Sequence, residues 1–137
     1  MPTLDQCHDN VVHALQKDGW TVQPLPLYLT LKRRRAFIDI QASRQENGSA
    51  NSIIVAEVKC LTDTESLTTD IYTAIGQYLI YRTLLRQKQF SMPIYLVVPE
   101  EIHTNSFDET VRLTMNESKI KLLVVNIATE TIVRWIE

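Results

Sequence analysis

The segment that most constrains the fold is a long stretch with helical periodicity, residues 64–88, set between two short apolar segments of strand length. Within it Leu67, Ile71 and Tyr78 recur at helical spacing, which predicts one broad apolar face. The flanking segments, residues 53–59 and 94–98, are rich in β-branched residues. A helix connecting two strands must bury its apolar face against a sheet. We therefore expect a mixed α/β (α+β) domain in which helices cover a central mixed sheet.

The remaining elements follow from periodicity and from turn and cap residues. Asn47-Gly48 is a strong turn signal, so the strands on either side of it should pair as an antiparallel hairpin. Ser106 and Glu109 have the spacing of a capping box, which predicts the start of a third helix. The expected order is α, three strands, α, β, α, β, β, with helices at 4–18, 64–88 and 107–117 and strands at 28–31, 36–41, 53–59, 94–98, 122–125 and 132–136. A short additional strand is expected at 20–22, directly after the first helix.

Composition narrows the class of protein. A chain of 137 residues with 45% hydrophobic residues is the size of a single domain, here residues 1–137. Fourteen Lys and Arg against sixteen Asp and Glu give a net charge of −2, so any contact with nucleic acid must come from a local patch. Two cysteines, Cys7 and Cys60, are too few for a disulfide framework or a zinc site. We expect free thiols, a cytoplasmic location and no membrane association, because no segment resembles a signal peptide or a membrane span.

Charged residues interrupt two of the predicted strands at positions that could lie side by side. Alternation within residues 36–41 places Phe37, Asp39 and Gln41 on one face, with Ile38 and Ile40 turned to the core. On the partner strand Glu57 and Lys59 likewise share a face. A carboxylate inside an apolar strand is costly unless something pairs with it. The predicted hairpin could bring Asp39 and Glu57 within a few ångströms of each other.

Two carboxylates at that distance repel each other and favour a cation between them. Oxygen ligands of this kind suit a hard divalent ion such as Mg²⁺ or Mn²⁺. Lys59 beside such an ion could activate a water or stabilise a pentavalent phosphate. This layout predicts phosphodiester hydrolysis. The alternative is a solvated sheet face that ends in an ordinary Glu/Lys pair.

Two further groups of residues have both a structural and a functional interpretation. Gln77 and Tyr81 lie four apart on one face of the long helix, where they could hydrogen-bond a catalytic lysine or a nucleic-acid backbone, or simply pack and be solvated. The run of Lys32, Arg33, Arg34 and Arg35 is the one basic cluster and precedes the Asp39 strand. It is either a solvated hairpin tip or a grip on phosphates at the rim of the site.

The arrangement of Asp39, then Glu57-Val58-Lys59, then Gln77-x-x-x-Tyr81 resembles the PD-(D/E)XK nuclease superfamily, and the helical pair is similar to that of its RecB-like members. Ile38 stands where the motif name has Pro. Over nearly its full length the chain is similar to the XisH family of cyanobacteria, the fdxN-element excision controlling factors. That second resemblance is carried by Met1-Pro2, His8-Asp9, Ala14-Leu15, Lys17-Asp18-Gly19-Trp20, Ile38-Asp39, Glu57-Val58-Lys59, Ala74-x-Gly76-Gln77-Tyr78, Tyr81-Arg82, Tyr95-Leu96-x-Val98-Pro99 and Val133-x-Trp135.

The resemblance implies a restriction-endonuclease-like core of order αβββαβ followed by αββ. It implies metal ligation by Asp39, Glu57 and the backbone carbonyl of Val58, with Lys59 as the catalytic lysine. His8 and Asp9 occupy a position at which superfamily members often place a supporting side chain. The implied activity is Mg²⁺-dependent hydrolysis of nucleic acid, with DNA as the expected substrate. The alternative is a catalytically silent regulator of DNA rearrangement that binds nucleic acid or a companion protein similar to XisI. A homodimer that pairs through an exposed edge strand is a further alternative.

Overall fold

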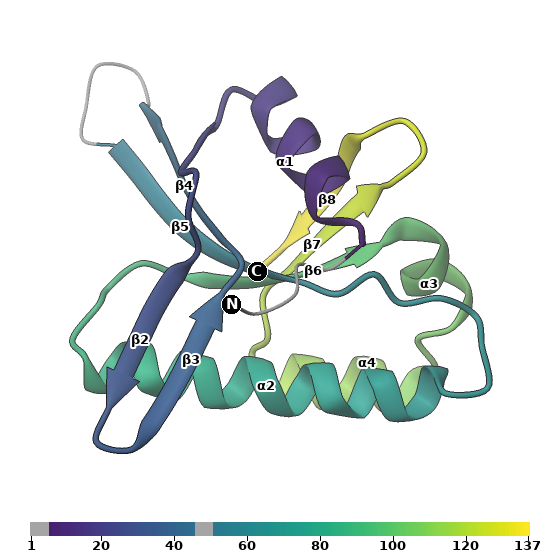
Figure 1. Cartoon of the computed structure of the whole chain (residues 1–137). Coiled ribbons are helices and arrows are strands. Elements are labelled where there is room, and N and C mark those ends of the chain that lie inside the picture. The colour runs from purple at the N-terminus through teal and green to yellow at the C-terminus, as the bar shows by residue number, and fades with distance from the viewer. Residues whose placement is uncertain (1–5, 46–50) are drawn as a thin grey trace.

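The computed structural model describes residues 6–45 and 51–137, and it forms a mixed sheet between two layers of helices (Figure 1). The six strands of the main sheet run in the order β1-β4-β5-β6-β7-β8; β5, β6 and β7 are parallel and the other pairs are antiparallel. Strands β2 and β3 form a separate antiparallel hairpin. The helices are α1 (His8–Lys17), α2 (Leu67–Gln87), α3 (Glu100–Asn105) and α4 (Glu109–Glu117). The strands are β1 (Thr21–Val22), β2 (Leu27–Leu31), β3 (Arg34–Ile38), β4 (Ile40–Gln45), β5 (Asn51–Val58), β6 (Ile94–Pro99), β7 (Leu122–Asn126) and β8 (Thr131–Ile136).

Each face of the sheet buries its own apolar core. Helix α1 covers one face, with Val11 and Leu15 packed against Ala56 and Val58 of β5. Helices α2 and α4 and the β2–β3 hairpin cover the other face, and Figure 1 shows them on the side of the sheet away from α1. The expected α/β architecture is therefore confirmed. Strand alternation explains why one sheet serves two cores, because successive residues of a strand point to opposite faces.

The predicted strand at residues 36–41 is broken at Asp39. Arg34–Ile38 pairs with β2, whereas Ile40–Gln45 turns away to pair with β5. Ile38 and Ile40 are both buried, as expected, but they enter different cores, so the prediction that they face the same way is wrong. The antiparallel pairing with the strand after residue 50 is confirmed, with Ile40 opposite Ala56. The predicted turn at Asn47-Gly48 lies outside the described residues.

Helix boundaries follow the sequence with two exceptions. Gly19 adopts φ +90 directly after the C-cap Asp18 and so ends α1, because glycine takes a positive φ without steric cost. The predicted Ser106 capping box is wrong, since Asp108 is the N-cap of α4 and its side chain accepts from the N–H of Val111. The short helix α3, in which His103 is buried, lies in a stretch where no helix was expected.

The two cysteines are not free thiols. Cys7, the residue before α1, and Cys60, two residues after β5, form a disulfide with a Cα–Cα distance of 5.3 Å. The expectation of free thiols is therefore wrong. The cysteines consequently no longer support the expectation of a reducing compartment. Across residues 6–45 and 51–137, no helix combines the length and apolar character needed to cross a membrane.

Candidate functional site

The break in the chain at Asp39 brings the two predicted carboxylates together. Asp39 lies between β3 and β4, and its Oδ2 accepts a hydrogen bond of 2.8 Å from the backbone N–H of Val58. Glu57, the neighbour of Val58 on β5, is 5% exposed and lies on the face that turns toward α2. The predicted proximity of Asp39 and Glu57 is thus confirmed, although a bend in the chain produces it rather than a continuous strand.

Burial raises the pKa values of both carboxyl groups. Burial raises the pKa of Asp39, and that rise is partly offset by the hydrogen bond from the N–H of Val58, by electrostatic interaction with His8 and Lys59, and by a side-chain hydrogen bond with Glu57. Burial and then the charge of Asp39 raise the pKa of Glu57 to about 8. Two carboxylates in one poorly hydrated place resist full ionisation, because each negative charge disfavours the other. Such a pair attracts a proton or a cation.

Lys59 supplies one positive charge at this place. Its Nζ lies 3.5 Å from Oε2 of Glu57, and its side chain is partly buried. The predicted common face of Glu57 and Lys59 is confirmed by this contact. The other carboxylate oxygen of Glu57, Oε1, is buried and has no hydrogen-bond partner among the described residues. One lysine therefore leaves part of the acid pair unsatisfied.

Helix α2 brings Tyr81 and Gln77 toward the same cluster. Burial raises the pKa of Tyr81, and the charges of Glu57 and Asp39 raise it further, which places the phenol near both carboxylates. Gln77 lies one turn earlier on α2, and its side-chain oxygen is buried without a partner within the described chain. Of the helical pair predicted from the sequence, Tyr81 therefore borders the acid pair, and Gln77 lies on the same face of α2.

Helix α1 contributes His8 but not Asp9. His8 lies near enough to Asp39 to lower the pKa of that carboxyl, and its Nδ1 is buried with no partner in the described ranges. Asp9 is exposed on the first turn of α1. Buried polar atoms are normally paired, so an unpaired one needs an explanation such as a water or an ion. The three unpaired atoms belong to His8 of α1, Glu57 of β5 and Gln77 of α2. Of these residues, His8 and Glu57 interact electrostatically with Asp39.

The donor set fits a hard cation in kind. Asp39 and Glu57 offer carboxylate oxygens, one of them unpaired, and Mg²⁺ in proteins is often held by one or two carboxylates with water completing its shell. Within the part of the chain that the structure describes, no group of three or more His, Cys, Asp and Glu side chains is arranged to hold a metal. A cation here would rely on these two acids, backbone oxygen and water.

The basic run lies apart from the acid pair. Lys32 and Arg33 form the turn between β2 and β3, and Arg34 and Arg35 begin β3; all four are exposed. Asp39 lies five residue steps along the chain from Arg34, the first residue of β3, a span of roughly 16 Å at about 3.3 Å per step of extended strand. The predicted turn is confirmed, but the cluster is at the far end of the hairpin from the acids.

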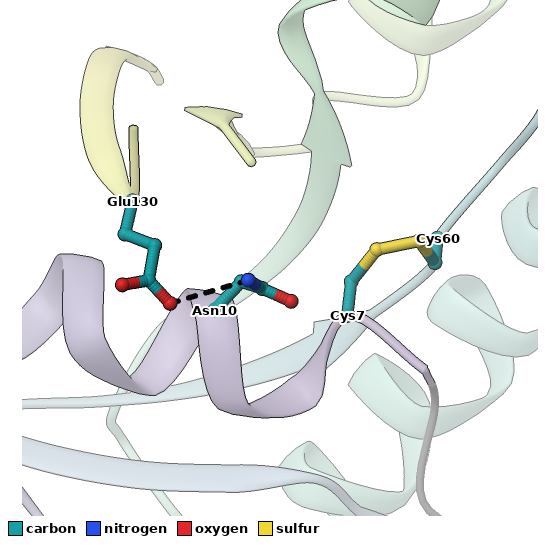
Figure 2. The surroundings of a disulfide bond; sticks show 4 residues. All are labelled: Cys7, Asn10, Cys60 and Glu130. Carbon is teal, nitrogen blue, oxygen red and sulfur yellow. Dashed lines mark hydrogen bonds between the residues drawn. A yellow bond between two sulfur atoms is a disulfide. The ribbon is translucent and has the colours of Figure 1, made fainter. Parts of the chain in front are cut away.

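A covalent link that the sequence pattern does not predict lies beside this cluster. The Cys7–Cys60 disulfide joins the residue next to His8 to the residue next to Lys59, as Figure 2 shows for the two cysteines. Helix α1, which begins directly after Cys7, is also held to the turn between β7 and β8. There the side-chain amide of Asn10 donates a hydrogen bond of 3.2 Å to Oε2 of Glu130 (Figure 2). The one available signal was that each cysteine adjoins a candidate site residue.

Comparisons with known proteins agree on one family. The model of the XisH family, described as XisH protein, matches residues 1–133. An XisH family protein from Nostoc punctiforme PCC 73102 is 30% identical, with a TM-score of 0.86 over 97% of this chain and 100% of that one. An fdxN element excision controlling factor protein from Anabaena variabilis is also 30% identical, with a TM-score of 0.83 over 95% of this chain and 97% of that one. A search of curated proteins finds no match.

Proposed function

Because the chain belongs to the XisH family, we propose that it is a metal-dependent nuclease-fold protein that hydrolyses phosphodiester bonds in nucleic acid. The observation that carries this proposal is the buried, unpaired Oε1 of Glu57 beside a second carboxylate and a lysine ammonium. Burying two acids in this way is costly in the protein alone, since charged groups lose their hydration. A bound cation would remove that cost.

In this proposal Asp39, Glu57 and the backbone carbonyl of Val58 hold Mg²⁺ or Mn²⁺. When bound, the ion supplies positive charge for the scissile phosphate and lowers the pKa of water. The protein's own part is to keep both carboxylates fixed. The N–H of Val58 does so for Asp39 at 2.8 Å, and the sheet does so for Glu57.

Lys59 is the catalytic lysine of this proposal. Its ammonium lies 3.5 Å from Glu57 and would face the attacked phosphate, where it would neutralise developing charge and orient the attacking water by donating a hydrogen bond to it. Gln77 and Tyr81 would orient Lys59 or the nucleic-acid backbone from α2. His8 would support Asp39 electrostatically from α1, whereas Asp9, exposed on the surface, would act only at longer range.

DNA is the substrate that we propose. The Anabaena variabilis relative is described as a controlling factor for excision of the fdxN element, so a role in a DNA rearrangement is the biological context we extend to this chain. The exposed residues Lys32 and Arg33 in the hairpin turn and Arg34 and Arg35 at the start of β3 would contact phosphates away from the cutting centre. Phosphate contacts of this kind position a duplex without reading its sequence.

A second candidate function is regulation without cutting. It is favoured by the net charge of −2 and by the distance of the basic turn from the acids, which together predict weak grip on a long nucleic acid. In this alternative the chain acts with an XisI-like companion protein. It could equally act as a homodimer, since β8 is a terminal strand of the main sheet and a terminal strand can pair with another chain.

The first experiment is a cleavage assay with single- and double-stranded DNA and RNA in Mg²⁺ and in Mn²⁺. We expect cleavage of DNA by the wild-type chain and a loss of about 10²-fold or more in Asp39→Asn, Glu57→Gln and Lys59→Met. Asp63→Asn, at an exposed acid on the segment after β5, is the matched control and should cut normally. Cleavage that survives in Asp39→Asn would identify a contaminating nuclease.

The second experiment separates the two candidates. A Mn²⁺ titration followed by calorimetry should show one site in the wild type and none in Glu57→Gln. Absence of both cleavage and metal binding would overturn the nuclease proposal. Co-elution with an XisI-like protein in size-exclusion chromatography would then support the regulator, and separate elution at micromolar concentration would remove it.

A further inference from the structure

A cavity lies on the α2 side of the sheet, apart from the acid pair. Its volume is about 980 Å³, and its walls come from the C-terminal half of α2, from α4 and from the starts of β6 and β7. None of the candidate site residues lines it. On α2, Tyr78 and Arg82 face this cavity, whereas Gln77 and Tyr81 belong to the neighbouring stripe of the helix. The helix thus separates two distinct places.

The charge of this cavity opposes that of the whole chain. Five of the fourteen Lys and Arg residues line it, namely Arg82, Arg86, Arg112, Lys119 and Lys121, against the single carboxyl side chain of Glu137. Because the whole chain has a net charge of −2, a cluster of five basic side chains is not expected on an ordinary solvated surface. Walls of one sign around a concave space focus the potential and attract ligands of the opposite sign.

No carboxylate within the described residues forms an ion pair with these cations. Arg82 donates instead to the carbonyls of Ser118, at 2.8 Å, and Lys119, at 3.2 Å. Arg112 donates to the carbonyls of Phe107 and His103. Carbonyl oxygens fix the position of a guanidinium but leave its positive charge in place, so the cavity keeps its capacity for an anion.

Hydrogen bonds between elements hold the walls in position. The hydroxyl of Tyr78, 1% exposed, donates to the carbonyl of Ile94 at 2.9 Å and accepts from the N–H of Lys121 at 3.1 Å, which joins α2 to the starts of β6 and β7. The bonds of Arg82 join α2 to the chain after α4. The cavity is therefore formed before any ligand arrives, as is usual for small-molecule sites.

Most of the remaining lining is apolar, with Ser91, His103 and Asn116 as its polar members. The apolar wall includes Leu85, Phe90, Met92, Met115 and Ile136. The volume lies within the range of small-molecule pockets, about 300–1,000 Å³, whose lining is mostly apolar with a few polar groups. We propose that this cavity binds a small amphiphilic anion, with its carboxylate or phosphate on the Arg and Lys side chains and its aliphatic or aromatic body against the apolar wall. This site would serve a function separate from the acid pair.

The test uses anilinonaphthalene sulfonate, a fluorescent probe with an anionic head and an aromatic body. We expect saturable binding at one site by the folded wild-type chain, weakened by salt. Dodecanoate or dodecyl phosphate should displace the probe, and whichever is stronger identifies the head group. Dodecyltrimethylammonium, with the same chain and the opposite charge, should not displace it. Equal displacement by the cation would overturn the proposal, because it would show a merely apolar surface.

Substitutions locate the binding. Lys121→Gln and Arg86→Gln should each weaken the probe about tenfold, the effect of losing one charge-assisted hydrogen bond. Lys88→Gln removes the same charge from the end of α2 outside the cavity and should change nothing. Equal weakening in all three variants, or stronger displacement by an acidic peptide than by either lipid anion, would overturn the proposal. So would loss of the probe on raising the protein concentration, which would show a second copy in the cavity.

Discussion

The ammonium nitrogen of Lys59 lies 3.5 Å from Oε2 of Glu57, while the other oxygen of the same carboxylate is buried without a partner among the described residues. Asp39 adds a second acid whose pKa, like that of Glu57, is raised chiefly by burial. One cation thus serves two carboxyl groups. This imbalance makes the stability of the protein sensitive to pH, to substitution of either acid and to divalent ions.

The first prediction concerns pH. The pKa of Glu57 is about 8 in the folded chain against an ordinary value of 4.5, so the folded state binds a proton that the unfolded state has released. The stability that this proton contributes is complete below about pH 4.5 and is lost as pH rises through about 8. Glu57→Gln should therefore flatten the decline in the free energy of unfolding, measured by urea denaturation between about pH 5 and pH 9 without metal.

The matched control is Glu65→Gln, which removes an exposed carboxyl group close to α2. It should leave the pH dependence of the wild type unchanged. Above pH 8 the melting temperature of Glu57→Gln should exceed that of the wild type by a few degrees, the effect of about 1 kcal/mol in a domain of this length. A melting temperature well below that of the wild type throughout would mean that the Glu57 carboxylate has a structural role.

The second prediction concerns divalent ions and the three charged residues of the site. Saturating Mn²⁺ should stabilise the wild-type chain by about 2.7 kcal/mol at one hundred times its dissociation constant. Asp39→Asn and Glu57→Gln should abolish this stabilisation, because each removes a ligand charge. Lys59→Ala should do the reverse, lowering stability without metal and retaining the response to Mn²⁺. Thermal melts of the four proteins at one pH, with and without the ion, measure all of these effects.

Strand alternation predicts the main sheet well because it depends on local sequence. Residues on β5 alternate between the two cores as period 2 requires, which correctly placed Glu57 on the same face as Lys59. The same rule failed at Asp39, since it assumes a continuous strand. There the carboxylate accepts from the N–H of Val58 and the chain turns from one sheet to another. That contact joins residues 19 apart, which local periodicity does not register.

Other features depend on tertiary position or on short segments. Helix α3, with buried His103, has only six residues, too few for an amphipathic period to show. Ser106 and Asp108 are both good N-cap residue types two positions apart, and only the backbone at Asp108 decides between them. The proximity of Tyr81 to the acids and the pairing of Cys7 with Cys60 both depend on how helices dock on the sheet.

The third prediction concerns Tyr78, which joins α2 to two strands. Its buried hydroxyl donates to Ile94 and accepts from Lys121. Tyr78→Phe keeps the ring but leaves a carbonyl and an N–H without their partner, so it should cost about 1–3 kcal/mol in the free energy of unfolding. Tyr72→Phe, at a tyrosine of α2 that is 64% exposed, should cost nothing measurable. Urea denaturation of both variants checks this, and equal stabilities would show that the hydroxyl bonds are weak.

The fourth prediction concerns the disulfide between Cys7 and Cys60. It closes a loop of 53 residues, and the chain-entropy model assigns such a cross-link about 4 kcal/mol of stability. The double variant Cys7→Ser and Cys60→Ser should lose about that amount in urea denaturation. The wild type in reductant should match it, whereas reductant should not affect the variant. Because the link holds the start of α1 beside the strand of Glu57, the variant should also lower the affinity for Mn²⁺. An unchanged unfolding midpoint in reductant, with two titratable thiols before its addition, would show that the cysteines are not linked.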